Sequence, residues 1–403
     1  MSKGSPSFRR GLTIFWGFLL AGCSDLATDF APLEDAVLYE ATRPVAPPSS
    51  VKSLTVMTWN IRYGAGHIPW FGDSCGDRVI LTRDEVMQGL EGLAGKIRRV
   101  DPDILLLQEV DRESKRTAYV DQVQWLLDHT DLNYGAYASA WRVQFIPSDG
   151  LGRMDTGNAI LSRWKITGSE RISLDLRGDQ SDLTRYFYLR RNILKVQLNL
   201  SNPENLFVVN VHSAAFAEDD TKQKHIQDFE RVLAELDEDG SMFVAGGDLN
   251  EVPPGSDSTD YCDEARCPDE PRDFCPEGSN YTGESGWLDG LYHRFNPAVS
   301  LDSYQQDNSP HFTYGRYDNG FWDRKLDYLF TNGRWVTDSD STHQDAFGLS
   351  DHAPVSATLR CCHDGQECSS CQPSSVHPDP VGPGPGSGRH PSDMVRGNSP
   401  HPS

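Results

Sequence analysis

The chain reads Met242-Phe243-Val244-Ala245-Gly246-Gly247-Asp248-Leu249-Asn250 at the point where an apolar run ends in an acid and an amide. Residues 242–247 have the length and the composition of a buried strand. A single acid or amide after a strand is usually a turn former or a helix cap. The pattern recurs along this chain, however, and the repeated strand ends together indicate a function that none of them indicates alone.

Five further apolar runs have the length of a strand. Each of them has polar side chains at its end, within it or directly before it. They span residues 54–59, 103–107, 206–211, 326–330 and 355–359. The complete polar set comprises Asn60, Arg62, Gln108, Glu109, His212, Asp248, Asn250, Asp327, Asp351 and His352. If the strand ends converge, their carboxylate and amide oxygens make a site for Mg²⁺, Mn²⁺ or Ca²⁺ with histidine beside it. The set is poor in cysteine, which argues against zinc.

Residues 51–360 read as one globular domain in which strands outnumber helices. Apolar residues recur at helical spacing over 86–97 and 226–236, and residues 120–128 are a third helical candidate. Several strands follow one another without a helix between them. The order of elements therefore predicts mixed sheets with helices packed outside, rather than a simple alternating parallel sheet.

The composition excludes several classes of protein. Hydrophobic residues make up 37% of the 403 residues, so a wholly disordered chain is excluded. Lys and Arg total 37 against 59 Asp and Glu, and the net charge of −22 argues against a protein that coats nucleic acid non-specifically. An enzyme acting on phosphate esters remains possible, because bound metal ions supply positive charge locally. No run of about twenty apolar residues lies beyond the N-terminus, which excludes a polytopic membrane protein.

Seven short motifs, taken in order, resemble those of the endonuclease/exonuclease/phosphatase superfamily. They are Trp59-Asn60-Ile61-Arg62, Gln108-Glu109-Val110, Gly157-Asn158-Ala159-Ile160-Leu161-Ser162, Val211-His212-Ser213, Gly247-Asp248-Leu249-Asn250, Leu326-Asp327-Tyr328 and Ser350-Asp351-His352. That superfamily includes DNase I-like nucleases, apurinic endonucleases, inositol polyphosphate phosphatases and neutral sphingomyelinases. The resemblance covers about residues 51–360 and implies a four-layer α/β sandwich, in which two mixed sheets face each other and helices lie outside.

The resemblance also implies a metal site. Glu109 matches the principal metal ligand of the family, Asn60 matches an amide that helps to position metal and phosphate, and Asp351 matches a further metal-associated acid. The cofactor implied is Mg²⁺, or Mn²⁺ or Ca²⁺ in its place. Arg62 either contacts phosphate or forms a structural salt bridge near the site.

Catalytic roles are implied for five more residues. Asp248 matches the acid that orients or deprotonates the attacking water, and Asn250 matches an amide that holds the phosphoryl oxygen or the water. His352 matches the imidazole on the phosphate, with Asp327 as its carboxylate partner. His212 stands where the DNase I-like and sphingomyelinase branches carry a second histidine, which would serve the leaving group.

These matches predict a metal-dependent phosphoester hydrolase of the phosphodiesterase type, with an endonuclease among the options, and we expect the protein to be a monomer. The motifs do not choose between nucleic acid, phospholipid and small phosphodiester substrates. The basic and aromatic run from Arg185 to Arg191 either grips a nucleic-acid backbone or is simply the edge of a strand. The pair Trp70-Phe71 would suit lipid contact. A sphingomyelinase-like enzyme and a non-catalytic binding module on the same fold are the alternatives, and the intact polar set favours an enzyme.

The N-terminus reads as an export signal. Lys3, Arg9 and Arg10 precede the apolar residues 12–20, and the following Leu20-Ala21-Gly22-Cys23 resembles the lipobox of bacterial lipoproteins. We therefore expect a signal peptide at 1–22, a lipidated Cys23 on a flexible tether at 23–50, and a protein anchored on the extracytoplasmic face of a bacterial envelope. An ordinary signal peptide with an incidental cysteine is the alternative.

Cysteine usage agrees with export. Of nine cysteines, setting aside Cys23 leaves eight, an even number that suits disulfides in an oxidising compartment. Four of them open the segment 361–403, which we interpret as a cysteine cluster followed by a disordered tail rich in Pro, Gly, Ser and His. A zinc cluster is the rival interpretation, but the chain lacks two well-spaced Cys-x-x-Cys pairs.

Overall fold

The structure is a computed structural model that describes residues 26–48, 51–70, 76–146, 148–200, 205–215, 217, 219–256, 284, 286–315 and 322–361. All of these residues belong to one compact unit, Met1–Pro373. The predicted signal peptide, Cys23 and the segment beyond Cys361 lie outside the described residues, and so does most of the acidic insertion, the loop-like segment of residues 251–284 that is rich in Asp and Glu. No helix within the described ranges is both long enough and apolar enough to cross a membrane.

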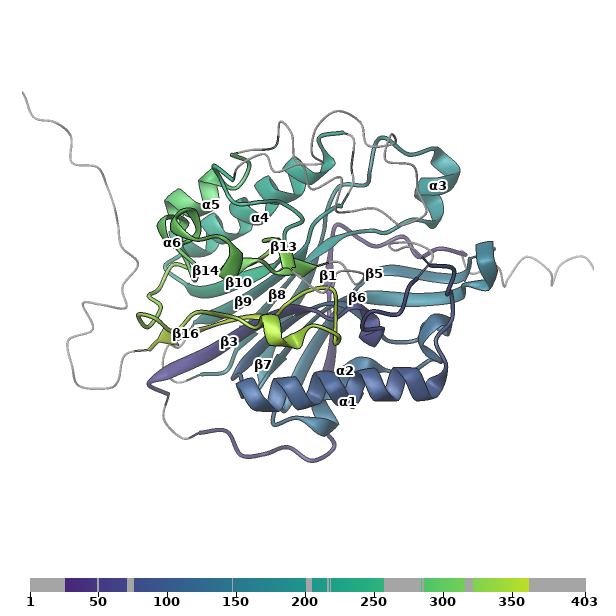
Figure 1. Ribbon diagram of the computed structural model, residues 1–403, viewed down its shortest axis with the longest axis horizontal. Helices are drawn as coiled ribbons and strands as arrows, with labels where there is room; N and C mark the ends of the chain where they lie inside the picture. Colours follow the sequence, from purple (N-terminus) through teal and green to yellow (C-terminus); the bar gives the residue numbers. More distant parts are fainter. Residues whose placement is uncertain are drawn as a thin grey trace, which may run out of the picture. The chain divides into compact units, whose positions relative to one another are not determined.

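Two sheets of seven strands each form the centre of the unit (Figure 1). The first has the strand order β1 (Leu33–Asp35), β7 (Ile166–Ser173), β8 (Asn192–Leu198), β9 (Leu206–His212), β10 (Met242–Asp248), β14 (Asp327–Thr331) and β11 (Asn296–Pro297). The second has the order β15 (Ser341–Thr342), β16 (Val355–Arg360), β3 (Ser53–Asn60), β4 (Ile104–Asp111), β6 (Gly152–Ser162), β5 (Tyr134–Ile146) and β2 (Val37–Glu40). Both are mixed, because β9 and β10 pair in parallel, as do β3 and β4, while the other pairs are antiparallel.

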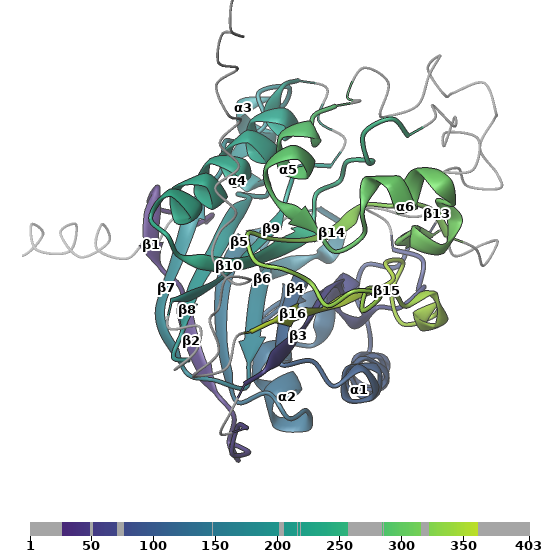
Figure 2. The same cartoon turned by 90° about the vertical axis from the view of Figure 1, so that its left-hand side faces the viewer.

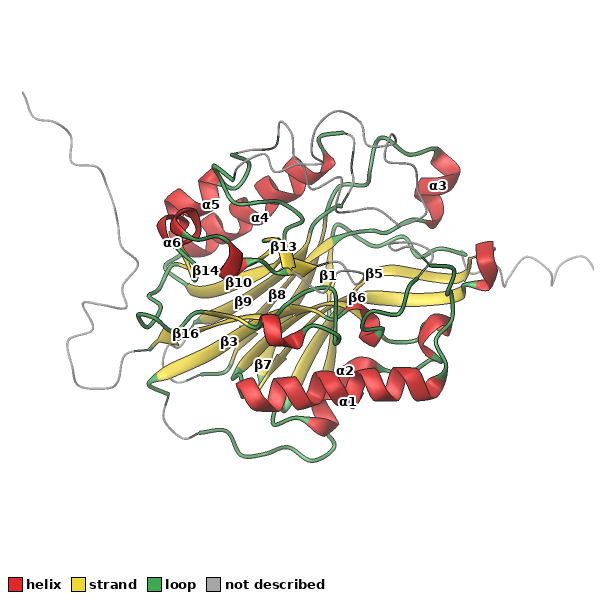
Figure 3. Cartoon of the chain, in the orientation of Figure 1, coloured by secondary structure: helices red, strands yellow, loops and turns green. Residues whose placement is uncertain are grey.

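The apolar side chains of the sheets divide into an inner core and two outer ones. Leu54, Val56 and Ile104 from one sheet pack between the sheets with Val196 and Val208 from the other, all of them fully buried. Helices lie against the outer faces of the two sheets (Figures 2 and 3), where outward-pointing apolar side chains of the central strands pack beneath them. Helices α1 (Arg83–Val100) and α2 (Gln122–His129) cover the second sheet, and α4 (Thr221–Glu238) and α5 (Asp289–Arg294) cover the first. The predicted four-layer α/β sandwich is therefore confirmed.

The three helical patterns of the sequence correspond to α1, α2 and α4. Helix α1 begins at a capping box, in which the Thr82 side chain accepts a hydrogen bond from the Glu85 backbone and the Glu85 side chain accepts one from the Thr82 backbone. It ends at Asp101, which adopts a left-handed conformation. The remaining short elements are α3 (Asp182–Phe187), α6 (Leu301–Gln306), the pair β12 (Tyr314–Gly315) and β13 (Trp322–Arg324), and 3₁₀ turns at Arg62–Gly64, Lys115–Thr117, Ser148–Gly150, Ser309–His311 and Gln344–Ala346.

The expected flexible tether at residues 23–50 is wrong for the part that the structure describes. Residues 26–48 lie on the domain, where β1 adds to the edge of the first sheet beside β7 and β2 adds to the edge of the second beside β5. These strands have three and four residues, and most of their side chains are exposed. They are held by backbone hydrogen bonds at sheet edges, which leave no apolar pattern in the sequence.

The prediction of disulfides is not confirmed. Cys361 is buried at the end of β16, and its thiol is free. Burial raises the pKa of this thiol to about 12, and the nearby Asp103 adds to the effect. The other seven cysteines of the predicted disulfide set lie outside the described residues.

Candidate active site

Asp248 lies at the centre of the polar residues, and the register of the first sheet explains why. It ends β10, where it pairs with His212 at the end of the parallel strand β9 and with Asp327 at the start of the antiparallel strand β14. The His212 Nε2 lies 3.3 Å from the Asp248 Oδ2. The backbone N–H of Asn250 donates to the other carboxylate oxygen at 3.0 Å. Three strand ends of one sheet thus supply an acid, a histidine and a second acid side by side.

Asn60 joins the second sheet to this centre. It ends β3, its side chain is buried, and its Nδ2 donates to Asp248 Oδ2 at 3.0 Å and to Glu109 Oε1 at 3.1 Å. Its Oδ1 accepts from the backbone N–H of Arg62 at 3.1 Å. The Asn60 amide nitrogen therefore hydrogen-bonds to one carboxylate from each sheet.

The backbone irregularity of β4 aims Glu109 at the site. The register of β4 against β6 shifts between Leu107 and Val110, which marks a bulge, and Glu109 adopts a φ of 55°. A non-glycine residue with this φ is uncommon, and bulges of this kind redirect a side chain. The preceding Gln108 points between the sheets and donates to Asn210 Oδ1 at 2.7 Å. The bulge thus separates a half-buried carboxylate at the site from a buried amide that links the sheets beneath it.

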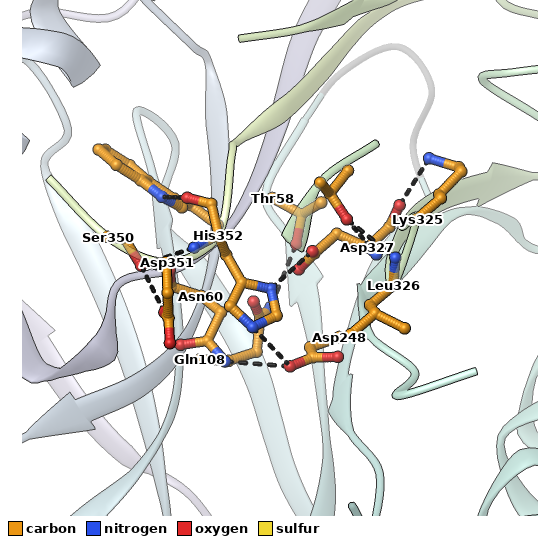
Figure 4. A network of polar contacts seen from close by, with 12 residues as sticks. Thr58, Asn60, Gln108, Asp248, Lys325, Leu326, Asp327, Ser350, Asp351 and His352 are labelled. Atoms are coloured by element: carbon orange, nitrogen blue, oxygen red, sulfur yellow. Dashed lines mark hydrogen bonds and ion pairs between the residues drawn. The ribbon is translucent and has the colours of Figure 1, made fainter. Parts of the chain in front are cut away.

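His352 forms an ion pair with Asp327 and also approaches Asp248 (Figure 4). Its Nδ1 lies 2.8 Å from Asp327 Oδ2, and its Nε2 lies 3.7 Å from Asp248 Oδ2. Burial opposes the charged form of this imidazole, but Asp327 and Asp248 outweigh it and raise the pKa of His352 well above its ordinary value. We therefore treat His352 as an imidazolium at neutral pH, with its orientation fixed by Asp327.

The second histidine has the opposite charge state. Burial, together with the positive charges of Arg191 and His352, lowers the pKa of His212 well below its ordinary value. Burial also raises the pKa of Asp248 to about 7, where Asp327 adds to the effect while His352 and Asn60 oppose it. The site thus combines a neutral imidazole, an imidazolium and a carboxyl group that titrates near neutrality.

Arg62 and Asp351 contact each other at the border of this group. The Arg62 Nε lies 3.4 Å from Asp351 Oδ2, and Nη1 donates to the backbone oxygens of Gly66 at 2.7 Å and Ile68 at 3.1 Å. The guanidinium is buried and fastens the loop after β3. Of the two roles that the sequence left open for Arg62, the structure favours the structural salt bridge.

Arg191 is a site residue that the sequence analysis did not single out. It lies between α3 and β8, and burial lowers the pKa of its guanidinium, while Tyr188, Glu109 and Asp248 oppose the effect. Among the described residues, no side chain forms a hydrogen bond or an ion pair with it. The sequence contained a signal, because Arg191 closes the basic and aromatic run from Arg185, but spacing alone did not show which arginine faces the site.

A buried charge cluster supports the loop that follows Asp248. The Lys222 Nζ, on α4, donates to the backbone oxygen of Asn250 at 3.0 Å and lies 3.2 Å from Glu251 Oε2. Lys222 also forms an ion pair with Glu284. Burial raises the pKa of Glu251 to about 9, with Glu284 adding to the effect and Lys222 opposing it. Lys222 and Glu284 thus tie the Asn250 loop to the far end of the acidic insertion.

The comparison with protein families agrees with this geometry. Residues 57–352 match the model of the Endonuclease/Exonuclease/phosphatase family, which is most of the chain. The fold and the site define a phosphoester hydrolase. The chain belongs to the endonuclease/exonuclease/phosphatase family.

Solved structures of low sequence identity resemble the chain. An endonuclease/exonuclease/phosphatase from Beutenbergia cavernae DSM 12333 is 21% identical, with a TM-score of 0.49 over 77% of this chain and 72% of that chain. A TDP2 from C. elegans is 16% identical, with a TM-score of 0.43 over 76% and 75% of the two chains. A family member from Leptotrichia buccalis C-1013-b is 16% identical, with a TM-score of 0.47 over 76% and 99%. A search of curated proteins gives no match.

Proposed function

We propose that this protein is a divalent-metal-dependent phosphodiesterase. The observation that carries the proposal is the placement of Asn60, whose single amide nitrogen binds Glu109 and Asp248 from two different sheets. Beside this pair lies the His352 imidazolium, held by Asp327. Hydrolysis of a phosphodiester needs a cation, a base for water and a donor to the phosphate oxygens, and these residues supply or hold each of them.

The donors around Glu109 fit a hard cation. Glu109, Asp351 and Asn60 offer carboxylate and amide oxygens without sulfur, the ligand set that Mg²⁺, Mn²⁺ and Ca²⁺ prefer. The acids crowd together in a buried place, and the raised pKa of Asp248 reports the cost of that burial. We assign Glu109 as the principal ligand. Asn60 and Asp351, which pairs with Arg62, are the further ligands. When bound, the cation would neutralise charge on the phosphoryl oxygens.

A second group of possible ligands lies at Asp248, Asp327 and His352, whose donor atoms are within 4.8 Å of one another. We assign this group to proton chemistry instead. The His352 Nδ1 already hydrogen-bonds Asp327, and an imidazolium has no lone pair for a metal.

The residues of the chain divide the remaining work by their charge state. Asp248, whose pKa lies near neutrality, accepts the proton of the attacking water, and Asn250 holds that water or a phosphoryl oxygen. The His352 imidazolium donates a hydrogen bond to the phosphate, while Asp327 fixes its tautomer. The neutral His212, whose Nε2 lies 3.3 Å from Asp248 Oδ2, hydrogen-bonds the leaving oxygen. That oxygen takes a proton from solvent, to which Asp248 in turn releases the proton it received from water. The Arg191 guanidinium binds a phosphoryl oxygen.

Hydrolysis of bis-p-nitrophenyl phosphate tests this proposal. We expect purified protein to release nitrophenol in the presence of Mg²⁺ or Mn²⁺. The release should stop when EDTA is added. Glu109→Gln should need at least about 10-fold more metal for half-maximal rate, because it removes one negative ligand. Glu113→Gln, which breaks an ion pair with Arg153, is the matched control and should not change the metal requirement. Activity that survives chelation would refute the proposal.

A parallel assay with plasmid DNA, RNA, sphingomyelin and inositol phosphates assigns the substrate class. Cleavage of a phospholipid without cleavage of DNA removes the nuclease option, and the reverse result removes the lipid option. If the protein cleaves none of these substrates in Mg²⁺ or Mn²⁺, the alternative of a non-catalytic binding module replaces the enzyme.

We also propose that the protein is exported and anchored in a bacterial envelope through a lipid on Cys23. The support is the sequence Leu20-Ala21-Gly22-Cys23 after a short apolar run. Cys23→Ser should release the protein from the membrane fraction of cells. Unchanged fractionation of the variant would refute the anchor.

A further inference from the structure

Exposed apolar side chains gather at one end of the described unit. Leu26 is 48% exposed, Phe145 54%, Leu183 72% and Tyr186 40%. We call these four residues the apolar ridge. Single exposed apolar residues are ordinary, but a group of them marks a contact surface.

Two hydrogen bonds attach both parts of the ridge to the same strand, β5. The backbone N–H of Gln144, next to Phe145, donates to the oxygen of Leu26 at 2.7 Å, so the first described residue lies on the end of β5. The Trp141 Nε1 donates to the backbone oxygen of Phe187 at 2.6 Å, which holds the end of α3 against the same strand. Figure 1 shows α3 and the far end of β5 and β6 on the same side of the sandwich.

The ridge lies at the same end of the sheets as the candidate active site. Val110, next to Glu109, pairs with Gly157 of β6, and Gly157 pairs with Ser139 of β5. From Ser139 the hairpin of β5 and β6 continues for seven residues to Ile146, roughly 20 Å beyond the level of Glu109. At the other part of the ridge, α3 ends four residues before Arg191, whose guanidinium interacts electrostatically with Glu109 and Asp248.

We propose that the apolar ridge contacts a phospholipid bilayer and that the substrate is a phosphodiester in the headgroup of a membrane lipid. This inference rests on the proposed function. Leu26 follows Cys23 by three residues, which span at most about 10 Å. Because residues 26–48 lie on the domain rather than forming a tether, a lipid on Cys23 places the ridge at the membrane surface and turns the strand ends of the active site toward it. Leucine and aromatic side chains are those that enter the bilayer interface.

The acidic charge of the chain favours a zwitterionic surface. A net charge of −22 repels anionic lipids, whose surface attracts basic proteins instead. Phosphatidylcholine and sphingomyelin carry a phosphodiester without net charge. Vesicles of these two lipids are therefore the probe.

Fluorescence quenching tests the contact without using activity. The purified protein with Phe145→Trp is mixed with vesicles of brominated phosphatidylcholine, and Leu38→Trp is the control. Leu38 is 56% exposed but pairs with Ala136, near the opposite end of β5. We expect the tryptophan at position 145 to add a quenched component to the wild-type emission and the one at position 38 to add none. Equal quenching, or no extra quenching at position 145, overturns the inference.

Hydrolysis tests the substrate. Phe145→Ser combined with Leu183→Ser should lower the rate on vesicle sphingomyelin at least 10-fold, and should leave the rate on bis-p-nitrophenyl phosphate unchanged. Leu38→Ser should change neither rate. Equal rates of the double variant and wild type on vesicles overturn the inference.

Two outcomes separate this inference from others. If wild type cleaves no phosphodiester at all, the proposed function fails, while the quenching result still decides the membrane contact. If the tryptophan at position 145 becomes buried without vesicles and the mass doubles, the ridge contacts a second copy of the chain and the membrane contact is refuted.

Discussion

At the scale of single residues, the neighbours of each group set its charge, and the charge sets its chemistry. His352 and His212 flank the same Asp248 carboxylate, yet the pKa of one rises and that of the other falls. Burial lowers the pKa of both imidazoles, but Asp327 and Asp248 outweigh it at His352, whereas the positive charges of Arg191 and His352 add to it at His212. Two residues of the same type thus carry different charges beside one carboxylate.

Arg191 carries the first prediction at this scale. Arg191→Ala should lower kcat/KM on bis-p-nitrophenyl phosphate about 100-fold, because a charged donor to the transition state is lost. Arg191→Lys should recover part of the loss. Arg185→Ala removes a more exposed arginine that pairs with Asp182 and should leave the rate unchanged. Equal effects of Arg191→Ala and Arg185→Ala would show that Arg191 does not touch the phosphate.

The Lys222 cluster carries the second prediction. Lys222→Met leaves the buried Glu284 carboxylate without its cation and removes the donor to the Asn250 backbone oxygen, so we expect the free energy of unfolding to fall by about 3 kcal/mol. Lys224→Met, on the same helix, breaks an exposed pair with Asp220 and should have no measurable effect. Urea unfolding of both variants at pH 7 gives the comparison. A stable Lys222→Met protein would contradict the energetic role of the cluster.

At the scale of elements, closely packed strands place the site. Gly247 precedes Asp248 with a φ of 134°, and a Cβ on it would lie 1.9 Å from the backbone oxygen of Val211 on β9. No side chain fits between these strands without moving them. Since His212 and Asp248 end the two strands, their distance depends on this glycine.

Gly247→Ala should therefore destabilise the protein and also reduce activity. We expect a loss of about 3 kcal/mol or more in unfolding free energy, from backbone strain and the clash with β9. Gly240→Ala is the matched control, because Gly240 also has a positive φ, 73°, but nothing lies within 4 Å of the added methyl group. It should cost about 1 kcal/mol. Similar losses in the two variants would contradict the packing argument.

His343, between β15 and β16, makes stability depend on pH. Its Nε2 lies 2.8 Å from Ser356 Oγ, and burial lowers the pKa of His343 to about 4, with Lys96 adding to the effect and Asp345 opposing it. The unfolded chain binds a proton near pH 6.5, but the folded one does not until near pH 4. The stability due to the neutral ring is thus present above about pH 6.5 and is lost as pH falls toward 4.

His343→Gln keeps a polar partner for Ser356 and removes this titration. Between pH 7 and 5 it should lose about 1 kcal/mol less stability than wild type, a figure reduced for the partial exposure of the ring. Urea unfolding at both pH values measures the difference. Parallel losses in the two proteins would show that His343 does not titrate between them.

Periodicity and composition predicted the elements that bury apolar side chains, and they missed those that do not. The patterns at 86–97 and 226–236 became α1 and α4, because one face of each helix packs on a sheet. Strands β1 and β2 escaped notice because backbone pairing at sheet edges holds them. The bulge that gives Glu109 a positive φ also leaves no sequence signal, since it depends on the pairing of β4 with β6.

At the scale of the whole sandwich, the two sheets meet at the candidate site. Asn60 and Glu109 come from one sheet, and His212, Asp248 and Asp327 come from the other. The motif order in the sequence predicted that these side chains would converge, and the structure brings them together. It could not show that Arg191 joins them, because that depends on how the segment between α3 and β8 packs.

Binding of Mn²⁺, measured by electron paramagnetic resonance, tests the central claim most directly. We predict that wild type binds the ion, that Glu109→Gln binds it at least about 10-fold more weakly and needs correspondingly more metal for hydrolysis, and that Asp327→Asn keeps binding but loses hydrolysis. Binding lost in Asp327→Asn but unchanged in Glu109→Gln, or no binding by wild type, would contradict this claim.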